Sequence, residues 1–197
     1  MSFYDRQELI QGINREMKVV VVGCGGIGFH VAKLLAMSGV TELYAFDPDT
    51  LEESNLNRLD LTTDFVGRNK ADIVKEVTKS LRPEMNVKVF PFPMKDHTYP
   101  KGVDWVIDCT DNHDAQIENQ RMADAYGAKY VKAGYDGERM SLNDRVATWD
   151  SGDTQDGYRV TPSWAVPAIM IACLTVGKVM KYSGGEMGCH LKDFYTV

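Results

Sequence analysis

The chain has 197 residues, of which 44% are hydrophobic, and it carries a formal net charge of −6 at pH 7. This length suits a single domain with a sizeable core. The acidic balance argues against nucleic acid as the main partner, because a nucleic-acid backbone calls for a basic surface. The longest apolar run, residues 165–176, contains Pro167 and is too short to span a bilayer. With no signal-peptide pattern at the N-terminus, we expect a cytoplasmic protein that has no membrane partner.

The cysteines and histidines show no metal-binding spacing. None of the four cysteines belongs to a C-x-x-C pair, so neither a zinc knuckle nor a disulfide framework is indicated. The four histidines are predicted to be surface or helix-cap residues: His30, His97, His113 and His190.

A short polar segment precedes the first apolar run. It contains Tyr4, Asp5, Arg6 and Gln7 in succession, and most N-terminal segments of this kind are surface arms. We therefore expect an arm over residues 1–17, followed by one domain over residues 18–197.

A glycine-rich turn between a strand and a helix dominates the next part of the chain. Residues 18–22 are almost all β-branched and apolar, which predicts a strand buried on both faces of a parallel sheet. Apolar residues at helical spacing follow the turn from Ile27 to Leu35. This order is the context that a G-x-G-x-x-G nucleotide-binding motif requires. The glycines of the turn are Gly23, Gly25, Gly26 and Gly28.

Each of these glycines has an expected task. Gly23 permits a tight turn, Gly25 and Gly26 let a phosphate approach the backbone, and Gly28 lets the helix close on the sheet. The N–H groups at the start of the helix favour an anion. The turn therefore predicts a nucleotide, but a dinucleotide and ATP both fit it.

The later elements predict an α/β fold. The second strand, residues 42–46, ends at Asp47, whose carboxylate can accept hydrogen bonds from ribose hydroxyls. Alternating strands and helices predict a doubly wound, mostly parallel, Rossmann-like sheet. Its ligands bind outside the carboxyl ends of the strands, where Gly23, Asp47 and Asp111 all lie. The further elements expected are a helix over 67–81, strands over 85–92 and 103–109, a helix that follows residues 110–112 and runs to about 126, and a strand over 129–134.

The C-terminal third is less regular. We expect an antiparallel strand over 145–149, a polar and flexible stretch over 150–157, and a strand near 189–197. Residues 162–182 predict one helix that is apolar on most faces, which places it in the core or in a subunit interface.

Four motifs occur in order: GCGGIG at 23–28, DPDTLEESNLNRL at 47–59, GRNK at 67–70 and DCTDN at 108–112. Together they make the sequence resemble the ubiquitin-activating-enzyme-like adenylyltransferases, the family of ThiF and MoeB. The resemblance covers most of residues 18–135. It implies ATP and Mg²⁺ as ligands, and a ThiF/MoeB-type fold whose C-terminal part is short here.

The side-chain chemistry agrees with the roles that the resemblance implies. The forked guanidinium of Arg58 and the point charge of Lys70 suit phosphate oxygens. Asn55 can hydrogen-bond phosphate or ribose, and Asp111 offers the oxygen that Mg²⁺ prefers. The resemblance assigns Asp47 to the ribose. Taken singly, Arg58 or Lys70 would more often be a solvated surface charge, and Asp111 could belong to a helix cap.

The resemblance also gives the arm a function. It implies that Arg6 reaches across the interface of a homodimer to the neighbour's ATP, although the linker to the first strand is shorter than is usual in the family. The glutamine that usually follows the family's Asn-Arg pair is Leu59 here. Many relatives carry a catalytic cysteine after the sheet, but residues 150–161 contain none, and Cys189 has no neighbour suited to lowering its pKa.

The expected function is ATP-dependent adenylation of the C-terminal carboxylate of a small ubiquitin-like or sulfur-carrier protein, without a thioester step. The resemblance implies a Gly-Gly tail on that carrier. Two alternatives stay open. One is a nicotinamide-dependent oxidoreductase, which shares the glycine turn and Asp47 but does not use Arg58, Lys70 and Asp111 together. The other is a non-catalytic nucleotide-binding scaffold of the same fold.

Overall fold

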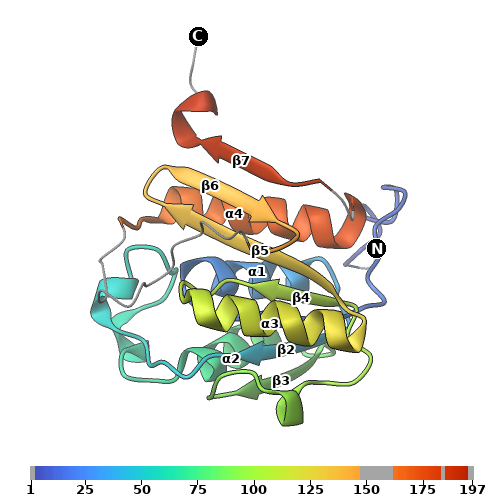
Figure 1. The fold of residues 1–197 in the computed structure, drawn as a ribbon, viewed down its shortest axis with the longest axis horizontal. Coiled ribbons are helices and arrows are strands. Elements are labelled where there is room, and N and C mark those ends of the chain that lie inside the picture. The colour runs from blue at the N-terminus through green and yellow to red at the C-terminus, as the bar shows by residue number, and fades with distance from the viewer. Residues whose placement is uncertain (1–2, 147–161, 183–184, 195–197) are drawn as a thin grey trace.

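The computed structural model describes residues 3–146, 162–182 and 185–194. They build a seven-stranded sheet in the order β3-β2-β1-β4-β5-β6-β7 (Figure 1). The pairs among β1 to β5 are parallel, and β6 and β7 are antiparallel. The predicted doubly wound, mostly parallel α/β fold is therefore confirmed. The strands are β1 (Lys18–Val22), β2 (Glu42–Phe46), β3 (Asn86–Phe90), β4 (Trp105–Asp108), β5 (Lys129–Asp136), β6 (Arg139–Asn143) and β7 (Met187–His190).

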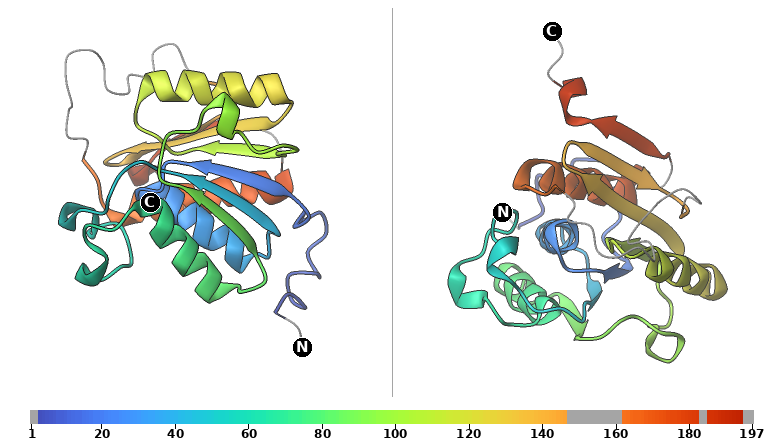
Figure 2. Two further views of the ribbon diagram at one scale, coloured as in Figure 1. Left: turned by 90° about the horizontal axis from the view of Figure 1, so that it is seen from below. Right: turned by 60° about the vertical axis from the view of Figure 1, so that its left-hand side comes forward.

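Helices cover both faces of the sheet, with α3 on one face and the other three on the opposite face (Figure 2). The sequence of β1 explains this arrangement, because every second valine points the same way. Val19 and Val21 pack into the larger core, whereas Val20 and Val22 pack into the core beneath α3. The helices are α1 (Gly26–Met37), α2 (Lys70–Leu81), α3 (His113–Tyr126) and α4 (Ala165–Gly177).

The antiparallel part of the sheet lies earlier in the chain than expected. β5 turns directly into β6 at Asp136 and Arg139, and Gly137 has the positive φ of 58° that a tight hairpin turn needs. Residues 145 and 146 belong to no strand, so the strand expected at 145–149 does not begin at Arg145. Residues 147–149 and the polar stretch at 150–157 lie outside the described part of the chain.

The last helix is also shorter than expected. Residues 162–164 are not helical, because Trp164 is extended with φ −157° and ψ 172°. Pro167 lies in the first turn of α4, where a missing N–H costs no hydrogen bond. After α4, Lys178–Tyr182 continue as a π-helical turn. The final strand was expected over 189–197, but β7 ends at His190 and Leu191–Phe194 form a 3₁₀ turn, so that expectation was largely wrong.

Helix length corrects one further expectation. The apolar run at residues 165–176 was expected to be too short to span a bilayer. The helical segment Ala165–Tyr182 has 18 residues, and by length and composition it could cross a membrane. Half of this segment is buried inside the protein. It packs on α1, β5 and β6, so we interpret it as a core helix.

The N-terminal segment packs at the end of α1 that is distant from the glycine turn. A Cβ built on Gly39, just after α1, would lie 2.7 Å from the ring of Tyr4. The guanidinium of Arg82 lies 4.5 Å from the ring centroid of Phe3, and its Nε donates to the Tyr4 hydroxyl over 3.0 Å. These contacts fix the start of the chain against the ends of α1 and α2.

Candidate active site

A large cleft opens at the carboxyl ends of the parallel strands. Its cavity volume of about 2080 Å³ exceeds the roughly 300–1,000 Å³ typical of small-molecule pockets, so it can hold a nucleotide together with a second reactant. The strand order reverses between β1 and β4, and this switch point is where doubly wound sheets bind ligands. The predicted residues that line the cleft are Gly23, Gly25, Gly26, Asp47, Asn55, Arg58, Lys70 and Asp111.

The glycine turn leaves the start of α1 open to the cleft. Gly23 has φ 83°, and a Cβ on Gly28 would lie 1.8 Å from the Gly23 carbonyl oxygen, so both positions require glycine. Gly25 precedes α1 without a side-chain cap, and a Cβ built on it would meet no atom within 4 Å. The first N–H groups of the helix therefore face space that an anion can enter.

Arg58 lies across the start of α1. A Cβ built on Gly26 would lie 2.9 Å from Arg58 Cδ, which shows how closely the arginine covers that residue. Its Nη1 donates to the Ser54 carbonyl over 3.1 Å and to Asn57 Oδ1 over 2.9 Å. His30 is buried in α1, and its Nε2 lies 2.9 Å from the Arg58 carbonyl oxygen. Because that oxygen can only accept, Nε2 carries the proton and holds the loop in place.

Lys70 begins α2 on the other side of the cleft. Its ammonium pairs with the Asp49 carboxylate over 3.1 Å, and only 15% of the lysine side chain is exposed. The neighbouring Asn69 caps α2 through Ala71 and Asp72, and its Nδ2 donates to the carbonyls of Asp47 and Asp49 over 3.0 Å. The cap therefore ties Lys70 to the end of β2.

Asp47 links the end of β2 to the glycine turn. Its Oδ2 accepts from the Cys24 N–H over 2.6 Å, and its Oδ1 accepts from the Asp49 N–H over 2.8 Å. Burial raises the pKa of this carboxyl, while the two N–H donors and the charge of Lys70 act in the opposite direction. The carboxylate is thus held in a fixed position at the wall of the cleft.

Asp111 is exposed to the cleft on a loop that Asp108 organises. The buried Asp108 Oδ1 accepts from the Thr110 N–H over 2.9 Å and from its hydroxyl over 2.7 Å. Its Oδ2 accepts from Asn119 over 2.9 Å and from the Tyr130 hydroxyl over 3.0 Å. Burial raises the pKa of the Asp108 carboxyl against the effect of these four donors.

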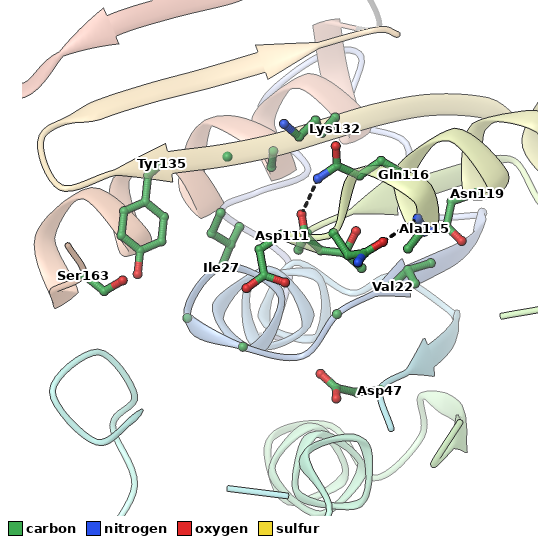
Figure 3. A pocket seen from close by; sticks show the side chains of 18 of the residues that line it. Val22, Ile27, Asp47, Asp111, Ala115, Gln116, Asn119, Lys132, Tyr135 and Ser163 are labelled. Carbon is green, nitrogen blue, oxygen red and sulfur yellow. Dashed lines mark hydrogen bonds between the residues drawn. The ribbon is translucent and has the colours of Figure 1, made fainter. Parts of the chain in front are cut away.

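Two further buried polar side chains line the cleft beside Asp111 (Figure 3). Gln116 Nε2 donates to the Thr110 carbonyl over 2.8 Å, whereas Gln116 Oε1 is buried without a hydrogen-bond partner among the described residues. Lys132 on β5 is 6% exposed. These two side chains therefore form part of the cleft wall on the α3 side.

Comparison with known proteins identifies the family. The sequence pattern of the ThiF family matches residues 4–194. The chain belongs to the ThiF family.

Relatives in the ThiF family include longer proteins. The molybdopterin-synthase adenylyltransferase of Salmonella typhimurium is 31% identical over 170 residues, covering 81% of this chain and 67% of the relative. Ubiquitin-like modifier-activating enzyme 5 of Oryza sativa subsp. japonica is 26% identical over 157 residues, covering 72% of this chain and only 36% of the relative. The chain therefore spans about a third of this plant protein.

The solved structures agree with this fold. Escherichia coli MccB, crystallised with AMPCPP and MccA, superposes with a TM-score of 0.71 at 25% identity. The match covers 85% of this chain and 56% of that chain. The match thus includes most of this chain, and the remainder of MccB has no counterpart in it.

Two predicted residues lie outside the cleft. Gly28 packs α1 on the glycine turn, as described above. Arg6 is exposed in the N-terminal segment, among residues that pack on the far end of α1, and does not line the cleft of its own chain. A role for Arg6 at an ATP site thus requires a second chain.

Several residues of the site were not predicted. Asp108 belongs to the DCTDN motif, so a buried strand that ends in a carboxylate was an available signal. His30 was wrongly expected at the surface or in a cap, because its contact with Arg58 joins parts of the chain 28 positions apart. Leu59 is buried in the core next to Arg58, which accounts for an apolar residue there. Tyr135, at the far end of β5, also lines the cleft.

The cysteines near the cleft have thiols whose pKa is raised. Cys189 lines the cleft at the end of β7, but burial and the charge of Asp193 raise the pKa of its thiol. Burial also raises the pKa of Cys24 and of Cys109 well above the usual thiol value. A raised pKa lowers the fraction of reactive thiolate at neutral pH.

Proposed function

We propose that this chain is an ATP-dependent adenylyltransferase, which joins AMP to the C-terminal carboxylate of a small ubiquitin-like or sulfur-carrier protein and releases pyrophosphate. The observation that carries the proposal is the convergence of Arg58, Lys70 and Asp111 on the open start of α1. Cations beside a helix N-terminus suit a triphosphate, and adenylyl transfer depends mostly on positioning and charge.

The nucleotide is ATP in this proposal. The ribose lies at Asp47, the triphosphate crosses Gly25 at the start of α1, and Arg58 and Lys70 bind its oxygens together with Asn55. The open space above Gly25 supports this placement, because an added Cβ would enter that space without meeting protein. Relatives named as adenylyltransferases, and a solved neighbour crystallised with AMPCPP, support the choice of ATP.

A magnesium ion fits the same site. Among the described residues, no group of three or more His, Cys, Asp or Glu side chains could hold a metal. Mg²⁺ is commonly held by one or two carboxylates and by substrate phosphates. Asp111, exposed to the cleft, would be the protein ligand. When bound, the ion would neutralise charge on the phosphates.

The acceptor is proposed to be the carboxylate at the end of a carrier protein, with a Gly-Gly tail as in the family. A cleft of about 2080 Å³ leaves room for such a tail beside ATP. A peptide carboxylate is a variant of the same substrate class, because the fold and the ATP site do not fix the acceptor. We propose that the acyl-adenylate is the product, because Cys189, the cleft thiol at β7, has a raised pKa.

Exchange of labelled pyrophosphate into ATP tests this function. The experiment uses a candidate carrier protein that ends in Gly-Gly, with a variant of that carrier lacking the tail as the control. Exchange that requires the intact tail supports the proposal. Binding of ATP·Mg without exchange for any candidate carrier favours a non-catalytic scaffold. Binding of NAD in preference to ATP would favour the oxidoreductase reading.

A further inference from the structure

Near the glycine turn, the cleft contains a further polar group that has no part in the proposed function. Tyr135 projects from the extended end of β5 toward the glycine turn (Figure 3). A Cβ built on Gly26 would lie 3.2 Å from the Tyr135 hydroxyl oxygen, and a similar 3.2 Å from Arg58 Cγ. The hydroxyl therefore lies beside the arginine at the start of α1.

The Tyr135 hydroxyl is available to a ligand. Its ring is half-buried and packs against the larger core, so the side chain is held in one direction. Within the described part of the chain, no hydrogen bond joins this hydroxyl to another residue. It also lines the cleft and is not a buried unsatisfied atom, so it can reach a molecule there.

A short connection fixes Tyr135 relative to Arg58. The carbonyl of Pro162 accepts from the Gly137 N–H over 2.8 Å, and Trp164 Nε1 donates to the Gly137 carbonyl over 3.0 Å. Asn57, adjacent to Arg58, donates through Nδ2 to the Ser163 carbonyl over 2.8 Å. Residues 162–164 therefore connect the β5–β6 hairpin, through hydrogen bonds, to the loop that carries Asn57 and Arg58.

We propose that the Tyr135 hydroxyl donates a hydrogen bond to a phosphate oxygen of the nucleotide, beside Arg58 and the first N–H groups of α1. This inference rests on the proposed function, since it requires ATP in the cleft. Tyr135, from the antiparallel part of the sheet, would add a neutral hydrogen-bond donor to the cationic groups of Arg58 and Lys70, which follow the parallel strands. A hydroxyl donor to a charged oxygen is among the stronger hydrogen bonds in proteins.

Isothermal titration of Tyr135→Phe tests the inference. ATP·Mg and inorganic pyrophosphate should each bind about tenfold more weakly than to the wild type, as expected for loss of one hydrogen bond to a charged group. Adenosine, which has no phosphate, should bind equally to both proteins. Tyr182→Phe is the matched control, because Tyr182 is 70% exposed and lies outside the cleft, and it should bind all ligands as the wild type does.

Two results would overturn the inference. Equal affinity of wild type and Tyr135→Phe for ATP·Mg would show that the hydroxyl meets no phosphate. An equal loss for adenosine would show that the substitution changes the shape of the cleft instead. If the wild type itself binds no ATP, the proposed function fails and this inference fails with it, so the two failures can be told apart.

Discussion

At the scale of single residues, the cleft is built from side chains that protein contacts already orient. The hydrogen bond to the Ser54 carbonyl orients the Arg58 side chain, and the contact between the Arg58 carbonyl and His30 fixes its backbone. The ion pair with Asp49 orients Lys70. Such contacts lower the conformational entropy that the side chains would lose on binding a ligand. The binding energy in our account therefore comes from cations that are positioned before the nucleotide arrives.

Replacement of Arg58 tests this account at one position. Arg58→Ala removes a charge-assisted contact, so ATP·Mg affinity should fall by about 10- to 100-fold. The free energy of unfolding should change by no more than about 1 kcal/mol, because the hydrogen bonds that the Arg58 side chain makes to described residues are exposed. Isothermal titration and urea denaturation measure the two quantities.

Arg145→Ala is the control for this experiment. Arg145 forms one exposed ion pair with Asp124 over 3.3 Å and does not line the cleft, so ATP affinity should be unchanged. A large loss of stability in Arg58→Ala with intact ATP binding would contradict the assigned role.

Asp108 gives a prediction about pH. Because its pKa is raised in the fold, the folded state binds the proton more tightly than the unfolded state does. The favourable contribution of Asp108 to the free energy of unfolding is fully present below the unfolded pKa of about 3.9. It is lost as the pH rises through the pKa of the folded state. The free energy of unfolding of the wild type, minus that of Asp108→Asn, should therefore be larger at about pH 5 than at about pH 8.

Urea denaturation at both pH values measures this difference. Asp114→Asn, in the exposed first turn of α3, provides a control for general effects of charge. A difference that grows toward pH 8 would show that the hydrogen bonds from Thr110, Asn119 and Tyr130 outweigh burial.

At the scale of elements, two glycines at the start of α1 meet different requirements. A Cβ on Gly28 would collide with the carbonyl of Gly23, whereas a Cβ on Gly25 would enter the open cleft. The first position serves the packing of helix on sheet, and the second serves the ligand in our proposal. The same motif thus combines a structural and a functional requirement.

Two alanine variants test that separation. Gly28→Ala should lower the free energy of unfolding by at least about 2 kcal/mol, because the backbone must shift to relieve the collision. Gly25→Ala should change it by about 0.5 kcal/mol or less and yet weaken ATP·Mg binding, because the methyl group occupies the space of a phosphate. Thermal unfolding and titration of both variants distinguish them. Normal ATP affinity in Gly25→Ala would place the phosphates elsewhere.

Elements with a strong local signal were predictable from the sequence. The bounds of β1 and β2 were predicted correctly, because a valine-rich strand, a glycine turn with its helix and a second apolar strand follow each other within one short segment. β6 was missed because its pairing depends on the hairpin at Gly137, in a stretch whose apolar pattern is weak. The motifs indicated which loops meet at the cleft, but not the contacts of Tyr135 or His30, which depend on how distant segments pack.

At the scale of the whole molecule, the N-terminal segment and the cleft lie at opposite ends of α1. Arg6 therefore cannot serve the cleft of its own chain in this arrangement, and the proposal that it acts on ATP requires a second copy. A homodimer with two-fold symmetry would give each site the Arg6 of its partner.

Mixing two inactive variants tests this arrangement. Arg6→Ala and Arg58→Ala should each lose exchange activity in separate preparations. After subunit exchange in an equimolar mixture, about a quarter of all sites would combine an intact Arg58 with an intact Arg6 from the partner, as follows from two-fold symmetry. Pyrophosphate exchange should recover to that extent. No recovery, with dimers verified by light scattering, would exclude a role in trans.

In the proposed complex, a triphosphate lies against the glycine turn and is bound by Arg58 and Lys70. A crystal structure of the chain with AMPCPP and Mg²⁺ tests it most directly. We predict phosphate oxygens within hydrogen-bonding distance of the first N–H groups of α1 and of both cationic side chains, with the ribose at Asp47. A nucleotide bound elsewhere, or one whose phosphates leave Arg58 and Lys70 turned toward solvent, would contradict the account.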